Sequence, residues 1–575
     1  MKQSVKHHLA LLYGKAATIE LEESFDTLIG QSQQSIPKTF SGKSELTESD
    51  CMLITYGDQV RAAGKSPLQA LANFLASRAK DILSAVHILP FYPSSSDDGF
   101  SVMDYYAVDP ELGGWNDVES LRERFDLMFD AVFNHASAQG VWFEKFLRQE
   151  RGWEAAFFTI TGNPDLSQVV RPRALPLLTE FETTNGKKQV WTTFSADQVD
   201  INFSDSRMLL RMLEVLLFYV SKGARYIRLD AIAFLWKIPG TSCIHLEQTH
   251  RVIQLMRAVL DEVAPNVQLI TETNVPHSDN ISYFGDGANE AQLVYNFALP
   301  PLVFHTMRTG DATRLRRWAQ ALELPSDRVT FFNFLASHDG IGLNPARGIL
   351  DPAEIDSLVQ AAFDHNGFVS YKNNPDGTKS PYELNISYFD ALSNPLGNEP
   401  EEIQAARFLA AHSIMLALRG LPGIYFHSLF GSRGDRKGAE ESGIPRRINR
   451  KKLDVSGLER ELDDPASLRA RVFLGLRSMI EARAANPAFS PYARQEVPEA
   501  APGLFVLVRR SSAGEKVICV TNVSADPTLF SLPAAAKWKS LLGFSEVPAN
   551  SNVELPPYGV LWFKQADALI EPEPD

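Results

Sequence analysis

Short apolar runs recur along the whole chain, and many of them end in a polar or charged residue. They are rich in β-branched and aromatic side chains, and their apolar positions are continuous rather than alternating. Eight such runs stand at Met52–Tyr56, Val86–Phe91, Asp126–Phe133, Tyr226–Asp230, Gln268–Thr273, Leu293–Leu299, Thr330–Leu335 and Gly423–Ser428. Continuous hydrophobicity is typical of parallel strands that are buried on both faces. We therefore predict eight parallel strands.

Amphipathic stretches of helical length lie between most of these runs. Arg207–Lys222 ends before Gly223, and Gln404–Arg419 ends before Gly420, as helices commonly do. A strand followed by a helix, repeated eight times, predicts a (β/α)8 barrel of the α/β class. A doubly wound open sheet is the alternative. The barrel is favoured because it brings the polar residues at the strand ends together on one catalytic face.

Segments that break the repeat predict further domains. Residues 136–203, after the third strand, are too long for a loop and predict an inserted subdomain B. Residues 340–399, after the seventh strand, are rich in turn residues and predict a second inserted subdomain, B′. Short strands at Leu504–Arg509, Lys516–Asn522 and Val560–Phe563 predict a C-terminal β-sandwich over residues 500–566. The barrel then comprises residues 51–135, 204–339 and 400–495, behind a helical extension over residues 1–50.

The composition narrows the functional classes. The chain has 575 residues and a net charge of −14, which opposes broad attraction to nucleic acids or anionic membranes. Three scattered cysteines support neither a disulfide framework nor a cysteine-based metal site. No apolar stretch is long enough to span a membrane, and the N-terminal residues lack the apolar run of a secretory signal. We expect a soluble cytoplasmic protein without nucleic-acid or membrane partners, and a homodimer remains open.

Polar residues at the predicted strand ends carry the candidate chemistry. Three carboxylates, Asp230, Glu272 and Asp339, would surround one cavity. Carboxylates so grouped raise one another's pKa, a cost that chemistry or a cationic partner must justify. Arg228 would point the same way as Asp230 and could hold its carboxylate ionised. An ionised carboxylate beside a protonated carboxyl is what retaining glycosyl transfer requires. Each of these residues taken alone would more simply be a salt-bridged strand end.

Four short motifs carry a resemblance to a known family. They stand at residues 130–135 (DAVFNH), 227–231 (IRLDA), 270–273 (ITET) and 337–340 (SHDG). Together they resemble the α-amylase-type glycoside hydrolases, family 13, and among these the sucrose phosphorylase group. The resemblance extends over nearly the whole chain. It implies a (β/α)8 barrel enzyme, a hexosyltransferase that moves a glucosyl unit to inorganic phosphate and forms α-glucose 1-phosphate.

The resemblance implies roles for individual residues. Asp230 would be the nucleophile, Glu272 the general acid and base, and Asp339 the stabiliser of the oxocarbenium-like transition state. We expect Arg228 to lower the pKa of Asp230, and neighbouring carboxylates to raise the pKa of Glu272. The residues that match sugar-binding positions of the family are Asp97, His135, Phe194, Gln198, Arg228 and His338. No metal and no organic cofactor is expected.

Two loop residues match phosphate-binding positions of the family. Arg173 is the second arginine of residues 171–176 (RPRALP), and Tyr382 lies in residues 380–385 (SPYELN), which resemble a mobile loop. Phosphate must meet the glucosyl-enzyme before water does, so a cationic and partly dry site is needed. A small-molecule α-glucoside, with inorganic phosphate as co-substrate, is therefore the expected partner.

Residues expected near the leaving group depart from simple sucrose phosphorylases. Glu383 stands where a glutamine is usual, Asn274 where a histidine is usual, and Arg446 and Arg447 where an arginine–aspartate pair is usual. A base in place of an acid at Arg447 favours an anionic leaving group, although these arginines could also form an ordinary solvated run. The segments 171–177, 334–345 and 372–384 look most like those of glucosylglycerate phosphorylases.

Three alternatives remain open. A sucrose or sucrose 6′-phosphate phosphorylase would share most of these motifs. A plain α-glucosidase would use water as the acceptor and would not need Arg173 or Tyr382. A noncatalytic sugar-binding module usually lacks the catalytic carboxylates, and all three are present here.

Overall fold

The computed structural model describes residues 2–36, 45–173, 175–374, 377–533, 537–543, 546–547 and 551–565, and only the backbone of residues 546–547. Parts of the predicted segments lie outside these described residues. They are residues 1 and 37–44 of the N-terminal extension, residue 174 of subdomain B, residues 375–376 of subdomain B′, and residues 534–536, 544–545, 548–550 and 566 of the C-terminal sandwich.

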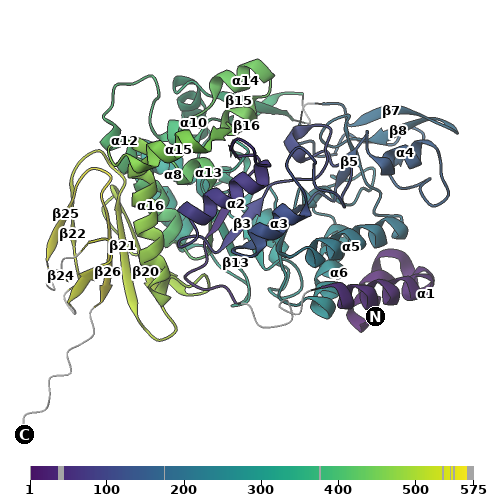
Figure 1. Cartoon of the computed structure of the whole chain (residues 1–575), viewed down its shortest axis with the longest axis horizontal. Helices are drawn as coiled ribbons and strands as arrows, with labels where there is room; N and C mark the ends of the chain where they lie inside the picture. The colour runs from purple at the N-terminus through teal and green to yellow at the C-terminus, as the bar shows by residue number, and fades with distance from the viewer. Residues whose placement is uncertain are drawn as a thin grey trace, which may run out of the picture.

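Eight parallel strands close into a barrel at the centre of the molecule (Figure 1). They are β1 (Met52–Thr55), β3 (Ala85–Ile88), β4 (Asp126–Ala131), β10 (Ala224–Leu229), β11 (Gln268–Thr271), β12 (Leu293–Tyr295), β13 (Thr330–Phe334) and β17 (Leu421–Tyr425). Strands that follow one another in this series pair with one another, and β17 closes the barrel against β1. Every residue of β1, β3, β13 and β17 is buried. The barrel predicted from the continuous apolar runs is confirmed.

The predicted runs extend past the ends of the strands, and at two strands a helix begins within the predicted run. β12 ends at Tyr295, and helix α8 (Leu299–Thr309) begins where the strand was expected to end, because Pro300 and Pro301 fit the first turn of a helix. β17 ends at Tyr425, and the short helix α13 (Phe426–Leu429) follows at once. These two strand limits are wrong because an apolar run does not distinguish a buried helical turn from a strand.

Helices cover the outside of the barrel. They include α2 (Pro67–Arg78), α3 (Trp115–Arg122), α5 (Ser206–Ser221), α6 (Glu247–Val263), α9 (Thr313–Gln320), α12 (Glu401–Ala417), α15 (Val455–Asp463) and α16 (Leu468–Ala484). Helix α5 begins after Asp205, whose carboxylate accepts a hydrogen bond from the backbone N–H of Arg207. The limits of α5 and α12 lie within three residues of the predicted helices.

Two insertions follow the third and seventh strands of the barrel. The first contains β5 (His135–Ser137), α4 (Val141–Leu147), β6 (Thr159–Ile160), β7 (Leu178–Thr183), β8 (Gly186–Trp191) and β9 (Gln198–Asp200). The second contains β14 (Ile341–Gly342), α10 (Pro352–Asp364), β15 (Phe368–Asn373), β16 (Lys379–Asn385) and α11 (Tyr388–Leu392). Each forms a small sheet of its own, β6-β8-β7 in the first and β14-β16-β15 in the second. In Figure 1 both small sheets lie on the upper side of the molecule.

The C-terminal region forms two further sheets, as predicted for a sandwich. One contains β19 (Arg494–Glu496), β20 (Leu504–Arg510), β21 (Lys516–Asn522), β26 (Val560–Gln565), β23 (Trp538–Ser540) and β24 (Glu546–Val547), and the other β22 (Thr528–Ser531) and β25 (Asn552–Leu555). Val506, Val520 and Leu555 contribute to a core between them. The buried Arg509 donates hydrogen bonds to the carbonyls of Ala417 and Ser490, each at 2.7 Å, and so ties this region to the barrel helices.

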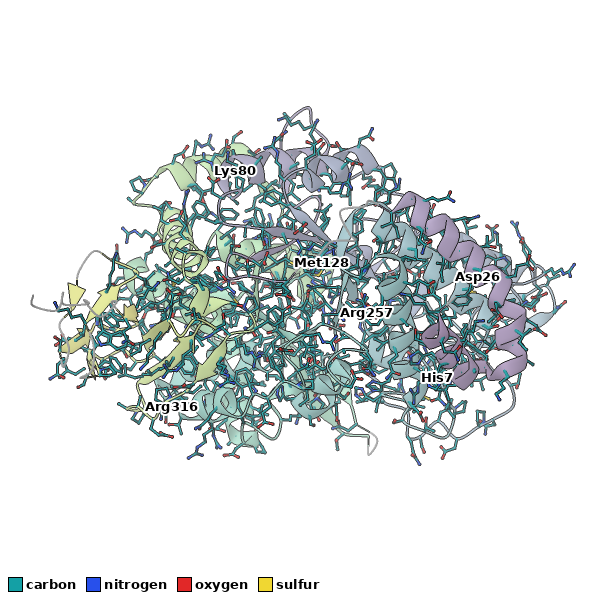
Figure 2. The ribbon with its side chains drawn as sticks, turned by 90° about the horizontal axis from the view of Figure 1, so that it is seen from below. His7, Asp26, Lys80, Met128, Arg257 and Arg316 are labelled. Carbon is teal, nitrogen blue, oxygen red and sulfur yellow. The ribbon has the colours of Figure 1, made fainter. Side chains whose placement is uncertain are left out.

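The N-terminal helix α1 (Gln3–Ser35) lies along the outside of the barrel. It bends at Gly14, whose φ of 83° interrupts the helical geometry. Leu9 and Phe25 are buried, and the Tyr13 hydroxyl donates to the carbonyl of Phe203 at 2.6 Å. Figure 2 shows α1 at the end of the molecule opposite the C-terminal sheets. No described helix is both long and apolar enough to cross a membrane.

Candidate active site

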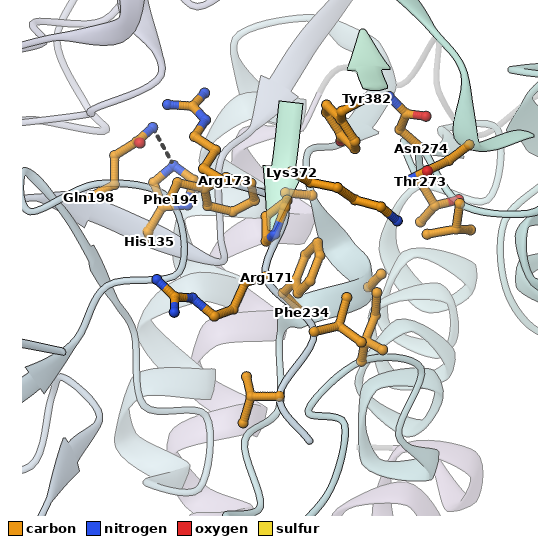
Figure 3. Close-up of a pocket in the computed structure, with 18 of the residues that line it drawn as sticks. His135, Arg171, Arg173, Phe194, Gln198, Phe234, Thr273, Asn274, Lys372 and Tyr382 are labelled. Carbon is orange, nitrogen blue, oxygen red and sulfur yellow. Dashed lines mark hydrogen bonds between the residues drawn. The ribbon is translucent and has the colours of Figure 1, made fainter. Parts of the chain in front are cut away.

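A cavity of about 410 Å³ opens where the carboxyl ends of the barrel strands meet the two insertions. Figure 3 shows part of its wall. Arg228 is buried behind the wall, whereas Glu383 and Arg447 do not line the cavity. The other residues predicted for the site all do: Asp97, His135, Arg173, Phe194, Gln198, Asp230, Glu272, His338, Asp339, Tyr382 and Arg446.

Asp230 and Glu272 share one guanidinium. Arg228 Nη1 lies 2.7 Å from Asp230 Oδ1, and Arg228 Nη2 lies 3.9 Å from Glu272 Oε2. Ala231 turns the chain directly after Asp230 with a left-handed φ of 47°, and its N–H donates to Glu272 Oε2 at 3.0 Å. A left-handed alanine is a strained conformation that the surrounding structure must hold in place. This turn therefore helps to position the two carboxyl groups relative to each other.

The Arg228 guanidinium is held from a neighbouring strand as well. Its Nη1 contacts Asp130 of β4, and the other oxygen of Asp130, Oδ2, lies 2.7 Å from His87 Nε2. Asp130 and His87 are fully buried. The guanidinium also faces the Tyr295 ring at 5.5 Å from its centroid. Arg228 is therefore fixed before a substrate binds, which favours electrostatic stabilisation without reorganisation.

The proton affinities of the two carboxyls differ in part from the expectation. Burial, the largest effect, raises the pKa of Asp230 to about 8, although the Arg228 charge acts in the opposite direction. The expected lowering of the Asp230 pKa is wrong, because the carboxyl is dry and its arginine is shared with Asp130. Burial also raises the pKa of Glu272. That direction is confirmed, but burial and not the neighbouring carboxylates is the main cause.

Asp339 is held ionised by arginines from the segment that follows helix α14 (Arg436–Ser442). Arg446 Nη1 lies 2.8 Å and Arg450 Nη2 3.5 Å from Asp339 Oδ1. Burial opposes ionisation, yet Arg446, His338 and Arg450 together hold the pKa of Asp339 well below its ordinary value. Glu383, expected as a substrate contact, instead binds Arg446 through two hydrogen bonds of 2.9 and 2.6 Å. It is a buried anchor for Arg446 outside the cavity wall.

A hydrogen-bonded group occupies the end of the cavity where the sugar-binding residues were predicted. Arg173 Nη2 lies 2.8 Å from Asp97 Oδ2, which also accepts from Gln198 Nε2 at 3.3 Å. Gln198 Nε2 lies 3.2 Å from His135 Nε2, the contact that is dashed in Figure 3. The Phe194 ring faces both the imidazole of His135, at 5.2 Å, and the guanidinium of Arg173, at 5.6 Å. Arg173, predicted to bind phosphate, is thus held by the aspartate predicted to bind glucose.

The two histidines of the site are uncharged. Burial lowers the pKa of His135 to about 4 and that of His338 to about 3. His338 stacks on Phe100 with 4.9 Å between the ring centroids. Neutral imidazoles can both donate and accept hydrogen bonds, which suits sugar hydroxyls. Among the described residues, no three His, Cys, Asp or Glu side chains are grouped so that they could hold a metal ion, and the expectation that no metal or organic cofactor takes part stays a prediction.

Tyr382 reaches the cavity from an irregularity in the β15–β16 hairpin. Ser370 pairs with Glu383 and Tyr371 pairs with Pro381, so Tyr382 is an extra residue without a partner on β15. Such a bulge changes the direction in which a side chain points. It explains how Tyr382 lines the cavity while the adjacent Glu383 binds Arg446 behind it.

The sequence analysis missed several residues of the cavity wall. Lys372, Asn344, Phe234 and Arg171 all line the cavity, and Figure 3 labels three of them. No motif singled out Lys372, Asn344 or Phe234, and Arg171 was quoted only as the first residue of the segment 171–176 without a role of its own. The available signal was that Lys372 and Asn344 lie in the segments 372–384 and 334–345, which resemble glucosylglycerate phosphorylases.

Arg447 lies away from the cavity. Its Nη2 is 2.7 Å from Asp98 Oδ1, and Arg450 Nη1 is 2.6 Å from the other oxygen of Asp98. These residues border a separate hollow that Tyr56 also lines. The structure therefore does not place Arg447 at the leaving group, because Asp98 holds it on the other side of the wall.

Comparisons with known proteins agree with this geometry. Residues 80–340 match the family of the α-amylase catalytic domain. The chain is 52% identical to glucosylglycerate phosphorylase of Allomeiothermus silvanus over 92% of this chain and 94% of the relative. It is 30% identical to sucrose phosphorylase of Agrobacterium vitis over 77% of this chain and 89% of the relative. The crystal structure of sucrose 6F-phosphate phosphorylase from Thermoanaerobacter thermosaccharolyticum shares the fold, with a TM-score of 0.72 at 22% identity over 84% of this chain and 95% of that one. The chain therefore belongs to the α-amylase family of glycoside hydrolases, in the group of the glucosylglycerate and sucrose phosphorylases.

Proposed function

We propose that this protein is a retaining phosphorylase that cleaves glucosylglycerate with inorganic phosphate and releases glycerate and α-glucose 1-phosphate. The proposal rests on one observation above all: Asp230 and Glu272 meet on the guanidinium of Arg228 in a cavity whose wall is rich in cations. A pair of carboxyls, one ionised and one protonated, is what retaining glycosyl transfer uses. The cations suit the anionic phosphate.

In the first half of the reaction, Asp230 attacks the anomeric carbon and Glu272 protonates the leaving oxygen. Burial raises the pKa of both carboxyls, so the pair retains a proton at neutral pH. Arg228 lies nearer to Asp230 than to Glu272, at 2.7 against 3.9 Å, which favours the state in which Glu272 holds that proton. Asp339, ionised beside Arg446, stabilises the positive charge that develops on the sugar ring.

In the second half, Glu272 takes a proton from phosphate, and a phosphate oxygen attacks the anomeric carbon. The bond to Asp230 breaks and its carboxylate is restored. Two inversions give α-glucose 1-phosphate with net retention. Arg173 and Tyr382 are the phosphate contacts we propose: Asp97 engages Nη2 of Arg173, and the guanidinium has further N–H donors for phosphate.

Two observations favour glycerate as the leaving group. The identity to a glucosylglycerate phosphorylase is 52%, against 30% to a sucrose phosphorylase. The cavity wall also contains four basic side chains, those of Arg171, Arg173, Lys372 and Arg446. A leaving group with a carboxylate fits such a wall better than uncharged fructose does. Fructose 6-phosphate is the second candidate on the same ground of charge.

The test is an assay for α-glucose 1-phosphate and free glucose, with glucosylglycerate, sucrose and sucrose 6′-phosphate, each with and without phosphate. We expect α-glucose 1-phosphate from glucosylglycerate, and only when phosphate is present. Release from a sucrose compound alone would overturn the proposed leaving group. Free glucose at the same rate with and without phosphate would identify a hydrolase, and no product from any donor would favour a noncatalytic module.

A further inference from the structure

The basic residues of the cavity wall differ in what balances their charge. Arg173 is paired with Asp97, and Arg446 is paired with Asp339. Lys372 is not paired: within the described part of the chain, its ammonium group has neither a carboxylate within ion-pair distance nor a hydrogen-bond partner, and no acidic group affects its pKa. Lys372 is thus a cation of the wall without a partner among the described residues, and an anionic ligand could supply one.

The position of Lys372 keeps its ammonium group inside the cavity. It lies on β15, directly opposite Ser380 of β16, and its side chain is half-buried. In Figure 3 it extends toward Thr273 and Asn274, on the side away from His135. Burial and the charge of the neighbouring Arg347 both lower the pKa of Lys372. A bound anion would offset both effects.

Hydrogen-bond acceptors for a hydroxyl group lie in the same wall. The side-chain oxygens of Asn274 and Asn344 are buried and have no hydrogen-bond partner within the described residues. Gly342 makes room for the first of them, since a Cβ at Gly342 would lie 2.7 Å from the amide group of Asn274. Buried polar groups are costly to leave unpaired, so these two oxygens also call for a partner from the ligand.

We propose that Lys372 binds the carboxylate of the leaving group and so selects glycerate over uncharged polyols. This rests on the proposed function and names the residue behind its choice of substrate. Glycerate released from the glucoside has a carboxylate next to the carbon that bore the sugar, and a hydroxyl on the next carbon. A single ammonium group and an amide oxygen would satisfy both. The wall arginines are less suited. Asp97 and Asp339 already neutralise Arg173 and Arg446, and the guanidinium of Arg171 donates to the carbonyl of Leu175 in its own loop.

The test compares two acceptors in the reverse reaction. Wild-type protein, Lys372→Met and the control Lys379→Met receive saturating α-glucose 1-phosphate, with either glycerate or glycerol as acceptor. Lys379 is exposed on the same hairpin and does not line the cavity, so its variant controls for a lost charge and for hairpin stability. The quantity measured is the ratio of kcat/KM for glycerate to kcat/KM for glycerol.

We expect Lys372→Met to lower this ratio by about 10- to 100-fold, through kcat/KM for glycerate alone, because a charge-assisted contact is lost. Lys379→Met should leave the ratio within about twofold, and Lys372→Arg should restore part of it. A ratio unchanged in Lys372→Met, together with a raised KM for α-glucose 1-phosphate, would assign Lys372 to phosphate and overturn the proposal. A wild-type protein that does not prefer glycerate would show that the proposed leaving group itself is wrong, before any variant is compared.

Discussion

The two ends of the cavity are built in different ways. At the glucosyl end, Asp97, Arg173 and Gln198 are bound to one another, and each charge has its partner. At the other end, where we propose that the leaving group binds, the ammonium group of Lys372 and the side-chain oxygen of Asn274 have no partner among the described residues. We call this the leaving-group end. The first group is complete without a ligand, whereas the second has polar groups that nothing in the described part of the chain pairs.

This difference indicates how specificity is divided. A group of paired charges keeps its geometry when the cavity is empty, so it presents the same sites to every glucosyl donor. Unpaired polar groups penalise any leaving group that cannot satisfy them, and such penalties discriminate strongly between similar molecules. The glucosyl end should therefore control the rate for all donors, and the leaving-group end should control the choice among donors.

Asp230→Asn should have the largest effect and should not depend on the acceptor. The amide cannot form the glucosyl ester, so phosphorolysis and reverse synthesis should both fall by at least about 10⁴-fold. Rates of α-glucose 1-phosphate formation and consumption measure this loss. Glucose binding, followed calorimetrically, is the control for an intact cavity, and substantial residual turnover with retained binding would contradict the assignment of Asp230 as nucleophile.

Arg173→Ala should affect phosphorolysis and hydrolysis differently, because phosphate is the acceptor in the first reaction and water in the second. Phosphorolysis should fall by about 100-fold, because a charged hydrogen-bond donor is lost, whereas release of free glucose should stay the same or increase. Arg171→Ala is the matched variant, since the Arg171 guanidinium donates to the carbonyl of Leu175 within the same loop. It should have a much smaller effect. Equal losses of phosphorolysis and hydrolysis in Arg173→Ala would show that this arginine serves only the glucosyl end through Asp97.

The barrel and its carboxylates were predictable because both follow from local pattern. Continuous apolar runs identify buried parallel strands, and Asp230 and Glu272 come directly after two of them. Strand ends in a barrel meet at one face whatever their separation along the chain. The two inserted segments were recognisable for a similar reason, since their length exceeds that of a connecting loop.

The charge pairing around the cavity was not predictable in the same way. Arg446 and Arg447 are adjacent in sequence, yet one binds Asp339 at the cavity and the other binds Asp98 outside it. Ion pairs of this kind depend on which loops lie next to each other in the folded protein. The hydrophobic periodicity of the sequence does not predict these contacts. The proton affinity of Asp230 escaped prediction for a related reason, because it depends on burial in the folded site and not only on the adjacent Arg228.

The pH dependence should report the shared proton of Asp230 and Glu272. Turnover needs one proton on the pair, and burial raises the pKa of both groups, of Asp230 to about 8. We therefore expect kcat/KM to fall on the acid side at a pH above the ordinary range of carboxyl groups, when the pair gains a second proton. It should fall again on the alkaline side when the pair loses its last one.

Glu272→Gln sharpens this test. With α-glucosyl fluoride, whose leaving group needs no protonation, only Asp230 has to be ionised. The alkaline fall should then disappear, whereas the acid fall should stay at about the same pH, because Glu272 is already protonated and uncharged at the pH where Asp230 of the wild type gains its proton. An alkaline fall that persists in Glu272→Gln would show that another group controls it.

Arg447→Met should have the smallest effect, although the sequence alone favoured this residue for selecting an anionic leaving group. Arg447 is 43% exposed and pairs with Asp98, which keeps its contact with Arg450 when Arg447 is removed. An exposed ion pair contributes at most about 1 kcal/mol, so the melting temperature should change little. The preference for glycerate over glycerol should stay within about twofold of wild type, in contrast to Lys372→Met. A tenfold loss of that preference in Arg447→Met would mean that the acceptor extends past the wall to Asp98, and Lys372 could then not be the main determinant of the leaving group.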